Sequence, residues 1–414
     1  MLNSATIQHL FKLVWNRKRS NTLIMIELFA TFLVLAGVST TIIHFSTVFV
    51  QPLGYEYKGV WNVLAYRKDD GTKVPNSVKV QTAQNIVAVL RSLPEVQSTS
   101  FISTTPFGFS HWTTDFGRRD NHFQTEICSA TDDFAATMGL TLSQGRWFDA
   151  TDDVMNGTTG TVKPVVINRI AAETFFGKEN PLGKEIIEMT RESDAKAAKP
   201  MHYRVIGVIP TFRKGSEFDQ SGNFMFRRVS LLDSTIWLPS QLLIKMKHGT
   251  DAAYEEKLLK ILQQAAPDWV FQISTLEADR EKKHKFFLIP LGVGMTIAAF
   301  LLLMVALGLV GVVWQSVMRR MREIGVRRAF GANRGDVTFF IIGELAAITT
   351  FSVVLGIIVL AQLPLIPFFD LPAATYLTSI GAAVAAMYGL TGLCAFYPSR
   401  LAARVQPSEA LRYE

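Results

Sequence analysis

Four long apolar blocks constrain the fold of this 414-residue chain more than any other feature. Each block reaches or exceeds the roughly 20 residues that an α-helix needs to cross a hydrocarbon core about 30 Å thick. The blocks run from Leu23 to Val50, from Phe286 to Met318, from Val337 to Leu365 and from Leu377 to Phe396. Because 49% of the residues are hydrophobic and only 19% are charged, the chain favours four membrane-spanning helices over helices buried in a large soluble core.

The basic residues predict the orientation of these spans, because cytoplasmic loops carry an excess of lysine and arginine. Three segments, one before the first span, one between the second and third and one after the fourth, together hold 13 basic and four acidic residues. The segments on the other side hold equal numbers of both. We therefore expect both termini to be cytoplasmic. The net charge of +7 follows from this topology and gives no reason to expect nucleic acid as a partner.

The expected fold class is an α-helical membrane protein with four transmembrane helices and a large α+β extracytoplasmic domain inserted between the first and second helix. The first span is interpreted as a retained anchor, because its apolar run is too long for the core of a signal peptide. The two cysteines, Cys128 and Cys394, lie in different parts of the chain. No disulfide framework is expected, so the outer domain must be held by its own core.

The patterns divide the chain into nine segments. The expected spans are 22–50, 286–318, 337–365 and 377–397. The expected connections are a cytoplasmic amphipathic helix at 1–21, an outer domain of two lobes with a stalk at 51–285, a cytoplasmic loop at 319–336, a short outer loop at 366–376 and a cytoplasmic tail at 398–414. The alternative for 1–21, whose apolar residues share one helical face, is a short soluble cap on the first span.

Alternating and helical patterns predict the elements of the outer domain. A strand at 60–67, a helix at 82–93 and a strand at 95–104 form a βαβ-like unit. Later elements are expected as a strand leading into a helix over 163–177, a strand at 202–210 and a helix at 251–267 that begins at an N-cap aspartate. The polar stretch 190–200 is predicted to be a loop inside one of the lobes.

A charged helix is expected to continue directly into the second span. A helix over 276–318 would be about 65 Å long, roughly twice the hydrocarbon thickness, with a kink at Pro290. The spacing places two ion pairs four residues apart on its first turns, namely Asp279 with Lys283 and Glu281 with Lys285. The outer domain is thus predicted to be tied to the membrane by a rigid rod.

The sequence carries no pattern of a catalytic site. The Gly183-Lys184 pair lacks the loop whose amides cradle phosphates, so this chain is not expected to hydrolyse nucleotide. The stretch Gly108–Trp112 lacks the second glycine of a nucleophile elbow. Several polar residues are close in sequence but fit no metal-ligand spacing, and they are interpreted as surface groups: His111, Asp115, Asp120, His122 and Cys128. We predict no catalytic residue, metal site or cofactor in the chain.

Two acids, Glu27 and Glu344, stand inside the apolar blocks. A charge at the centre of a membrane costs about 2.5–3.5 kcal/mol on insertion scales and often marks function. Both acids lie near the cytoplasmic ends of their spans, so snorkelling or pairing with the loop arginines is favoured over an ion or proton path.

The loop from Arg319 to Asp336 combines six arginines with apolar residues. A short cytoplasmic helix is expected before Gly331, and Asn333 is placed to cap the third span. A solvated basic loop explains the charge alone, whereas a helix that enters a groove of a partner protein also explains the apolar residues. Those residues are Met321, Ile324, Ala329 and Phe330.

Three motifs resemble a known family. "MREIGVRRAFGANRGDV" and the ending "YPSRLAARVQPSEALRYE" are similar to the two signatures of the FtsX-like permease domain of MacB-type ABC transporters. "PVVINRIAAETFFGKENPLGKEI" resembles part of their MacB-like periplasmic core domain. The resemblance covers essentially the whole chain, which lacks the ATPase domain that is fused to the full-length pumps.

The resemblance implies a permease, a homodimer or a heterodimer with a similar permease, that couples ATP hydrolysis by a separate ATPase to movement of the outer domain. That ATPase would bind ATP and Mg²⁺. Export or extraction of a hydrophobic compound, peptide or lipoprotein is expected, with a periplasmic adaptor and an outer-membrane channel as further candidate partners. The implied coupling residues are Arg320, Arg322, Glu323, Ile324, Arg327, Arg328, Phe330 and Gly331. The alternative is an FtsX-like signalling protein that activates a cell-wall hydrolase.

Overall fold

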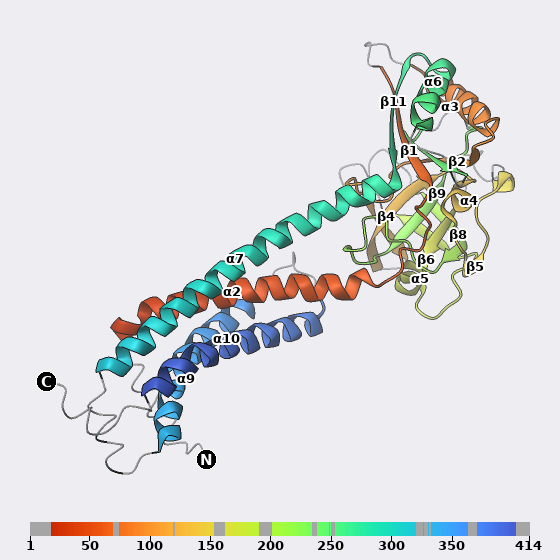
Figure 1. Cartoon of the computed structure of the whole chain (residues 1–414). Helices are drawn as coiled ribbons and strands as arrows, with labels where there is room; N and C mark the ends of the chain where they lie inside the picture. Colours follow the sequence, from red (N-terminus) through yellow and green to blue (C-terminus); the bar gives the residue numbers. More distant parts are fainter. Residues whose placement is uncertain are drawn as a thin grey trace. The chain divides into compact units, whose positions relative to one another are not determined.

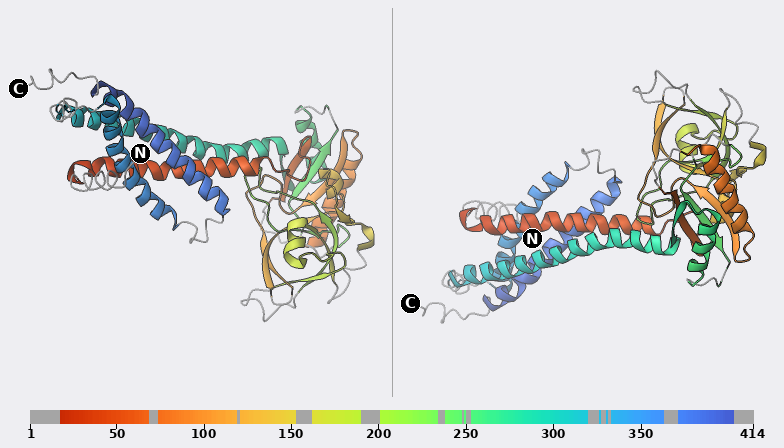
Figure 2. Two further views of the ribbon diagram at one scale, coloured as in Figure 1. Left: turned by 90° about the horizontal axis from the view of Figure 1, so that it is seen from below. Right: turned by 90° about the horizontal axis from the view of Figure 1, so that it is seen from above.

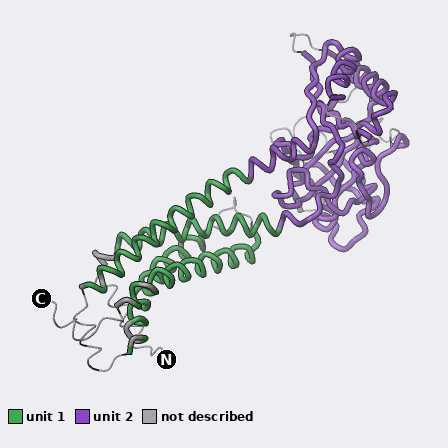
Figure 3. Tube along the Cα trace, viewed as in Figure 1, with its two compact units in different colours: residues 1–47, 288–414 green, residues 48–287 purple. Residues whose placement is uncertain are grey.

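The chain forms two compact units, which we call the helical unit (residues 1–47 and 288–414) and the outer unit (residues 48–287) (Figure 3). The computed structural model describes residues 18–68, 74–118, 121–152, 162–189, 201–233, 238–247, 249, 253–319, 326, 330, 333–362 and 371–402. The predicted coupling loop and the N-terminal amphipathic helix lie largely outside these residues.

Within the described residues, four helices have the length and hydropathy of membrane spans, as predicted (Figure 1). They are α2 (Lys18–Phe49), α7 (Leu276–Arg319), α9 (Arg334–Leu360) and α10 (Ala373–Ala402). Helix α7 contains 44 residues and stays helical through Pro290. Its first turns belong to the outer unit and the rest to the helical unit.

The helical unit is held together by one apolar core to which all four helices contribute. Figure 2 shows from two further sides that α9 and α10 lie beside α2 and α7. Phe32 of α2 is fully buried against Gly356 of α9, where an added Cβ would lie only 2.3 Å from the ring. Polar contacts add to this packing, because the Ser352 hydroxyl donates to the Met25 carbonyl at 3.0 Å. Small residues and interhelical hydrogen bonds are typical of helices that pack inside membranes.

The strands of the described residues form one sheet in the outer unit, with two lobes. The first lobe has the strand order β11-β1-β10-β2, all antiparallel to their neighbours. Its strands are β1 (Val60–Arg67), β2 (Val96–Ile102), β10 (Gln241–Met246) and β11 (Trp269–Thr275). Helices α3 (Asn76–Arg91) and α6 (Tyr254–Ala265) pack on them through a core that includes Ile86, Phe101 and Leu258.

The second lobe is a closed ring of six strands, β4-β3-β7-β8-β6-β9, because β9 also pairs with β4. These are β3 (Thr113–Arg118), β4 (Asn121–Ala130), β6 (Lys163–Asn168), β7 (Glu185–Glu188), β8 (His202–Ile209) and β9 (Phe224–Arg228), with the short β5 (Gln144–Gly145) beside β8. Helix α5 (Arg169–Phe176) packs against the ring, and α4 (Phe134–Met138) joins a core shared by both lobes.

Three predictions about the outer domain are corrected by the structure. The βαβ-like unit is split, because β10 lies between β1 and β2. Helix α3 begins at Asn76 rather than at residue 82, since its first turns are polar and show little apolar periodicity. Helix α6 begins at Tyr254 with Ala253 as its N-cap and no side-chain cap, so an aspartate at 251 does not start it. The strand at 60–67 and the stop of α5 at Gly177 are confirmed.

Candidate functional site

The predicted coupling residues are represented in the structure by Phe330 alone. Its side chain is 89% exposed, and its N–H donates to the carbonyl of Val326, which is also exposed, at 3.1 Å. The others lie outside the described residues: Arg320, Arg322, Glu323, Ile324, Arg327, Arg328 and Gly331. Their docking role stays a prediction.

The two intramembrane acids both occupy half-buried positions in the helical unit. Glu27 of α2 lies against Gly308 of α7, where an added Cβ would meet its carboxylate oxygen at 3.2 Å. The absence of a side chain at Gly308 therefore lets the two helices approach each other at the acid. Glu344 lies in α9 beside the buried Leu345. Their pairing with the loop arginines stays a prediction.

Where α7 begins, the outer unit holds a cluster of charged residues that we call the basal joint: Arg213, Lys214, Glu217, Arg280, Lys283 and His284. The loop between β8 and β9 supplies the first three, and the first turns of α7 supply the others. Glu217 is only 6% exposed. One of its carboxylate oxygens accepts a hydrogen bond from Nε of Arg280, and the other lies 2.8 Å from Nε2 of His284. Because Arg280 and His284 are four residues apart, they share a face of α7.

Arg213 connects the same loop to the segment that follows α2. Its guanidinium group is buried and donates to the carbonyl oxygens of Gln51 at 2.7 Å, Glu217 at 2.7 Å and Asp219 at 2.8 Å. A buried cation is tolerated when its donors are satisfied in this way. The two chain segments that enter and leave the outer unit are therefore both bound to one loop of the second lobe.

Two buried lysines connect the basal joint to β4 and to the segment before β3. Nζ of Lys214 lies 2.7 Å from a carboxylate oxygen of Glu126. Nζ of Lys283 donates to the Gly108 carbonyl at 3.3 Å and lies 4.2 Å from the centre of the Phe109 ring. Cation–π contacts of this kind add stability to a partly desolvated ammonium group.

The basal joint holds Glu217 in its charged form. Burial by itself would raise the pKa of Glu217, but the hydrogen bonds from His284 and Arg280 outweigh it, so the pKa lies below the usual glutamate value. Nearby, burial and then the Glu217 charge raise the pKa of Tyr55, whose neutral hydroxyl donates to the Arg213 carbonyl at 3.2 Å.

Helix α7 is also fixed to the first lobe. It follows β11 without a loop, and the Thr275 hydroxyl accepts from the Ala278 N–H at 3.1 Å, which caps the helix. Glu277 accepts from the N–H of Gly59 at 2.6 Å. Asp279 accepts from the Ser274 hydroxyl at 2.9 Å and lies 3.4 Å from Nζ of Lys282.

One of the two ion pairs predicted on α7 is confirmed, because Lys285 lies 2.7 Å from Glu281. The pairing of Asp279 with Lys283 is wrong. Lys283 is only 4% exposed and turns to the Gly108 carbonyl instead. Sequence spacing identified the charged face of the helix, but it carried no signal for Glu217, which is distant in sequence and becomes a neighbour only through the fold.

Comparisons with known proteins assign the family. Residues 28–265 match the family model of the MacB-like periplasmic core domain, and residues 295–407 match that of the FtsX-like permease C-terminal region. The chain belongs to the MacB-like permease family. The first match alone covers more than half of the permease, and the resemblance predicted from the three motifs is confirmed. With its four apolar helices, this permease is a membrane protein with an extracytoplasmic domain.

Individual relatives of the permease are exporters. It is 25% identical over 364 residues to the macrolide export ATP-binding/permease protein MacB of Pasteurella multocida, a match of 82% of this chain and 50% of that protein. It is 24% identical over 344 residues to the pyoverdine export ATP-binding/permease protein PvdT of Pseudomonas aeruginosa, covering 78% of this chain and 47% of that protein. The permease thus spans about half the length of the curated relatives it matches.

A similar solved structure is the periplasmic region of MacB from Actinobacillus actinomycetemcomitans. The match has 17% sequence identity and a TM-score of 0.37, and it covers 56% of this chain and 96% of that chain.

Proposed function

We propose that this protein is the membrane subunit of a bacterial ABC transporter and couples ATP hydrolysis by a separate ATPase to movement of its outer unit. The observation that carries the proposal is the course of α7. This single helix runs from Arg319, the first residue of the predicted coupling loop, to Leu276, where it joins strand β11 directly. A displacement applied at the loop has an unbroken helical path to the outer unit.

The contacts at the start of α7 support transmission of that displacement to both lobes. Glu277 and Asp279 hold α7 to the first lobe, while Arg280 and His284 hold it to the second lobe through Glu217. Changing the populations of two conformations of the outer unit from 1:99 to 99:1 requires about 5.5 kcal/mol. Hydrogen bonds to charged groups contribute about 1.5–3 kcal/mol each to stability. Several of them together therefore match this free energy, so the contacts can stay intact while the outer unit changes conformation.

The proposed cargo is a hydrophobic compound, peptide or lipoprotein, exported or extracted from the inner membrane by a dimer of the permease. The names of the relatives, which are export proteins, support an outward direction. A periplasmic adaptor and an outer-membrane channel would complete the route.

Substitution of the loop tests the proposal. Glu323→Ala and Arg327→Ala are expected to abolish co-purification of an ABC ATPase from the native host and to abolish export, while the permease stays folded. Lys260→Ala, at an exposed residue of α6, is the matched control and should retain both. The proposal fails if the wild-type permease associates with no nucleotide-hydrolysing subunit, or if the loop variants export normally.

The match to the FtsX-like permease C-terminal model supports one alternative, a signalling protein whose outer unit activates a cell-wall hydrolase. Cross-linking of the outer unit in living cells separates the two functions. A hydrolase recovered from the cross-links favours signalling, whereas a hydrophobic compound, peptide or lipoprotein favours transport.

A further inference from the structure

A cavity of about 400 Å³ lies between the two lobes of the outer unit. One wall comes from α3 and β2 of the first lobe. The other comes from residues 131–133, which follow β4, and from residues 228–232, at the end of β9 and beyond it. This volume falls within the range of about 300–1,000 Å³ that small-molecule sites occupy. It is separate from the basal joint, whose residues do not line it.

Much of the cavity lining is apolar. Val87 and Ala88 of α3, Phe101 of β2 and Leu231, which follows β9, all line it. Phe101 is fully buried, and Leu232 at the same wall is 76% exposed. A site with this lining favours a ligand that has an apolar body, because burial of apolar area drives such binding.

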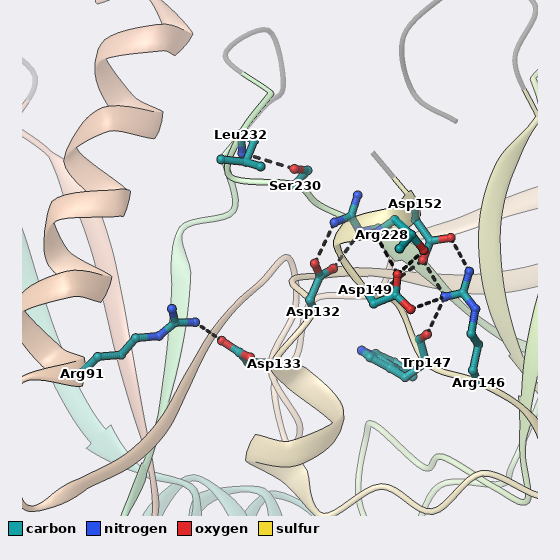
Figure 4. Close-up of polar contacts among 11 residues, drawn as sticks. Arg91, Asp132, Asp133, Arg146, Trp147, Asp149, Asp152, Arg228, Ser230 and Leu232 are labelled. Carbon is teal, nitrogen blue, oxygen red and sulfur yellow. Dashed lines mark hydrogen bonds and ion pairs between the residues drawn. The ribbon is translucent and has the colours of Figure 1, made fainter. Parts of the chain in front are cut away.

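Each charged residue in the cavity lining already has a partner of opposite charge (Figure 4). Arg228, whose side chain is 3% exposed, binds both carboxylate oxygens of Asp132 at 2.7 Å. Arg91 of α3 binds Asp133 across the two lobes. The walls therefore carry no uncompensated charge, so a charged ligand would have to break an ion pair or enter without a counter-charge.

One polar group in the lining lacks a partner. Thr99 of β2 is 2% exposed, and its hydroxyl makes no hydrogen bond with any residue that the structure describes. The great majority of buried polar groups in proteins have a hydrogen-bond partner. A ligand group that hydrogen-bonds this hydroxyl would supply the missing interaction.

We propose that this cavity binds an uncharged, mainly apolar small molecule that carries one hydrogen-bonding group, and that the bound molecule bridges the two lobes. The inference does not depend on the coupling function proposed above, because binding requires no ATPase. It is tested on the full-length permease in lipid nanodiscs.

The experiment uses two photoreactive probes of nearly equal shape. 4-Benzoylbenzamide is uncharged and offers an amide group, whereas 4-benzoylbenzoate carries a carboxylate on the same apolar body. After irradiation, the labelled peptides are identified by mass spectrometry. We expect the amide probe to label α3 or residues 228–232 saturably, and the carboxylate probe to label them at least about tenfold less at equal concentration, because its charge finds no free partner.

Two substitutions on α3 provide the controls. Ala88→Trp places an indole in the cavity from an exposed position and is expected to remove the labelling. Asn85→Trp, at an exposed α3 residue outside the lining, should leave it unchanged, and equal melting temperatures verify that both variants fold. Labelling that is not saturable, that persists in the Ala88→Trp variant, or that is equal for both probes overturns the proposal.

Discussion

At the scale of single residues, Glu217 is the group on which the basal joint depends. Its carboxylate is almost completely buried and binds two side chains of α7 at once. Removal of one partner from a buried charged network leaves the other groups without hydrogen bonds. This lowers the free energy of unfolding more than the loss of an exposed ion pair does.

Substitution of Glu217 by glutamine tests this dependence. The neutral amide accepts hydrogen bonds from Arg280 and His284 less strongly than the carboxylate does. Glu217→Gln is therefore expected to lower the free energy of unfolding by about 2 kcal/mol, which corresponds to roughly 4–8 °C in the melting temperature of the outer unit. The matched control is Glu173→Gln, at an exposed ion pair with Arg169, which should change stability by less than about 0.5 kcal/mol. Equal melting temperatures of the two variants would contradict the role of Glu217.

The lowered pKa of Glu217 predicts how this stability varies with pH. Because the pKa is lower in the folded state than in the unfolded state, the charged carboxylate stabilises the fold above the unfolded value and stops doing so as the pH falls through the folded value. The difference in melting temperature between wild type and Glu217→Gln should therefore be present at neutral pH and should shrink below about pH 4. Thermal unfolding followed across a pH series measures this difference, and one that grows in acid would show the opposite linkage.

At the scale of elements, the contact between α2 and α9 depends on a glycine. The ring of Phe32 occupies the space that a side chain at Gly356 would need. Helices in membranes gain their association energy largely from such close packing, so this contact fixes how α9 approaches α2.

Two glycine-to-alanine substitutions separate packing from helix propensity. Gly356→Ala is expected to destabilise the helical unit by about 1–3 kcal/mol, because the added methyl group overlaps the Phe32 ring. Gly381→Ala in α10, where an added Cβ meets nothing within 4 Å, should be neutral or stabilising, since alanine favours helix over glycine. The melting temperatures of both full-length variants in detergent provide the comparison. An unchanged melting temperature of the Gly356→Ala variant would show that α9 does not pack against Phe32.

At the scale of the whole molecule, the proposed function requires the outer unit and the coupling loop to lie on opposite sides of the membrane. The spans and the positive-inside pattern predict this arrangement. If both were on one side, no helix would need to carry a displacement across the bilayer.

Cysteine labelling measures the sidedness directly. Glu256→Cys in the outer unit and Phe330→Cys in the loop are exposed positions, to be introduced after Cys128 and Cys394 are replaced by alanine. In right-side-out membrane vesicles, a membrane-impermeant maleimide should label residue 256 at once and residue 330 only after detergent is added. Labelling of both residues without detergent would place the loop outside.

The sequence alone determined the properties that depend on the residues of one continuous segment. The length of an apolar run decides whether a helix can span a bilayer, and the count of arginines in a loop predicts its side. Strand β1 and the end of α5 at Gly177 follow from short patterns in the same way. The family motifs are likewise continuous segments, so their resemblance to the permease family does not depend on the fold.

The tertiary structure alone decided which distant segments meet. Strand β10 enters between β1 and β2, and β9 closes the ring on β4, because strand pairing depends on the packing of the complete core rather than on a local signal. The partners of Arg280 and His284 were decided in the same way, since Glu217 comes from a separate loop. A helix pattern predicts that a charged face exists, but only the folded chain determines which charge lies opposite it.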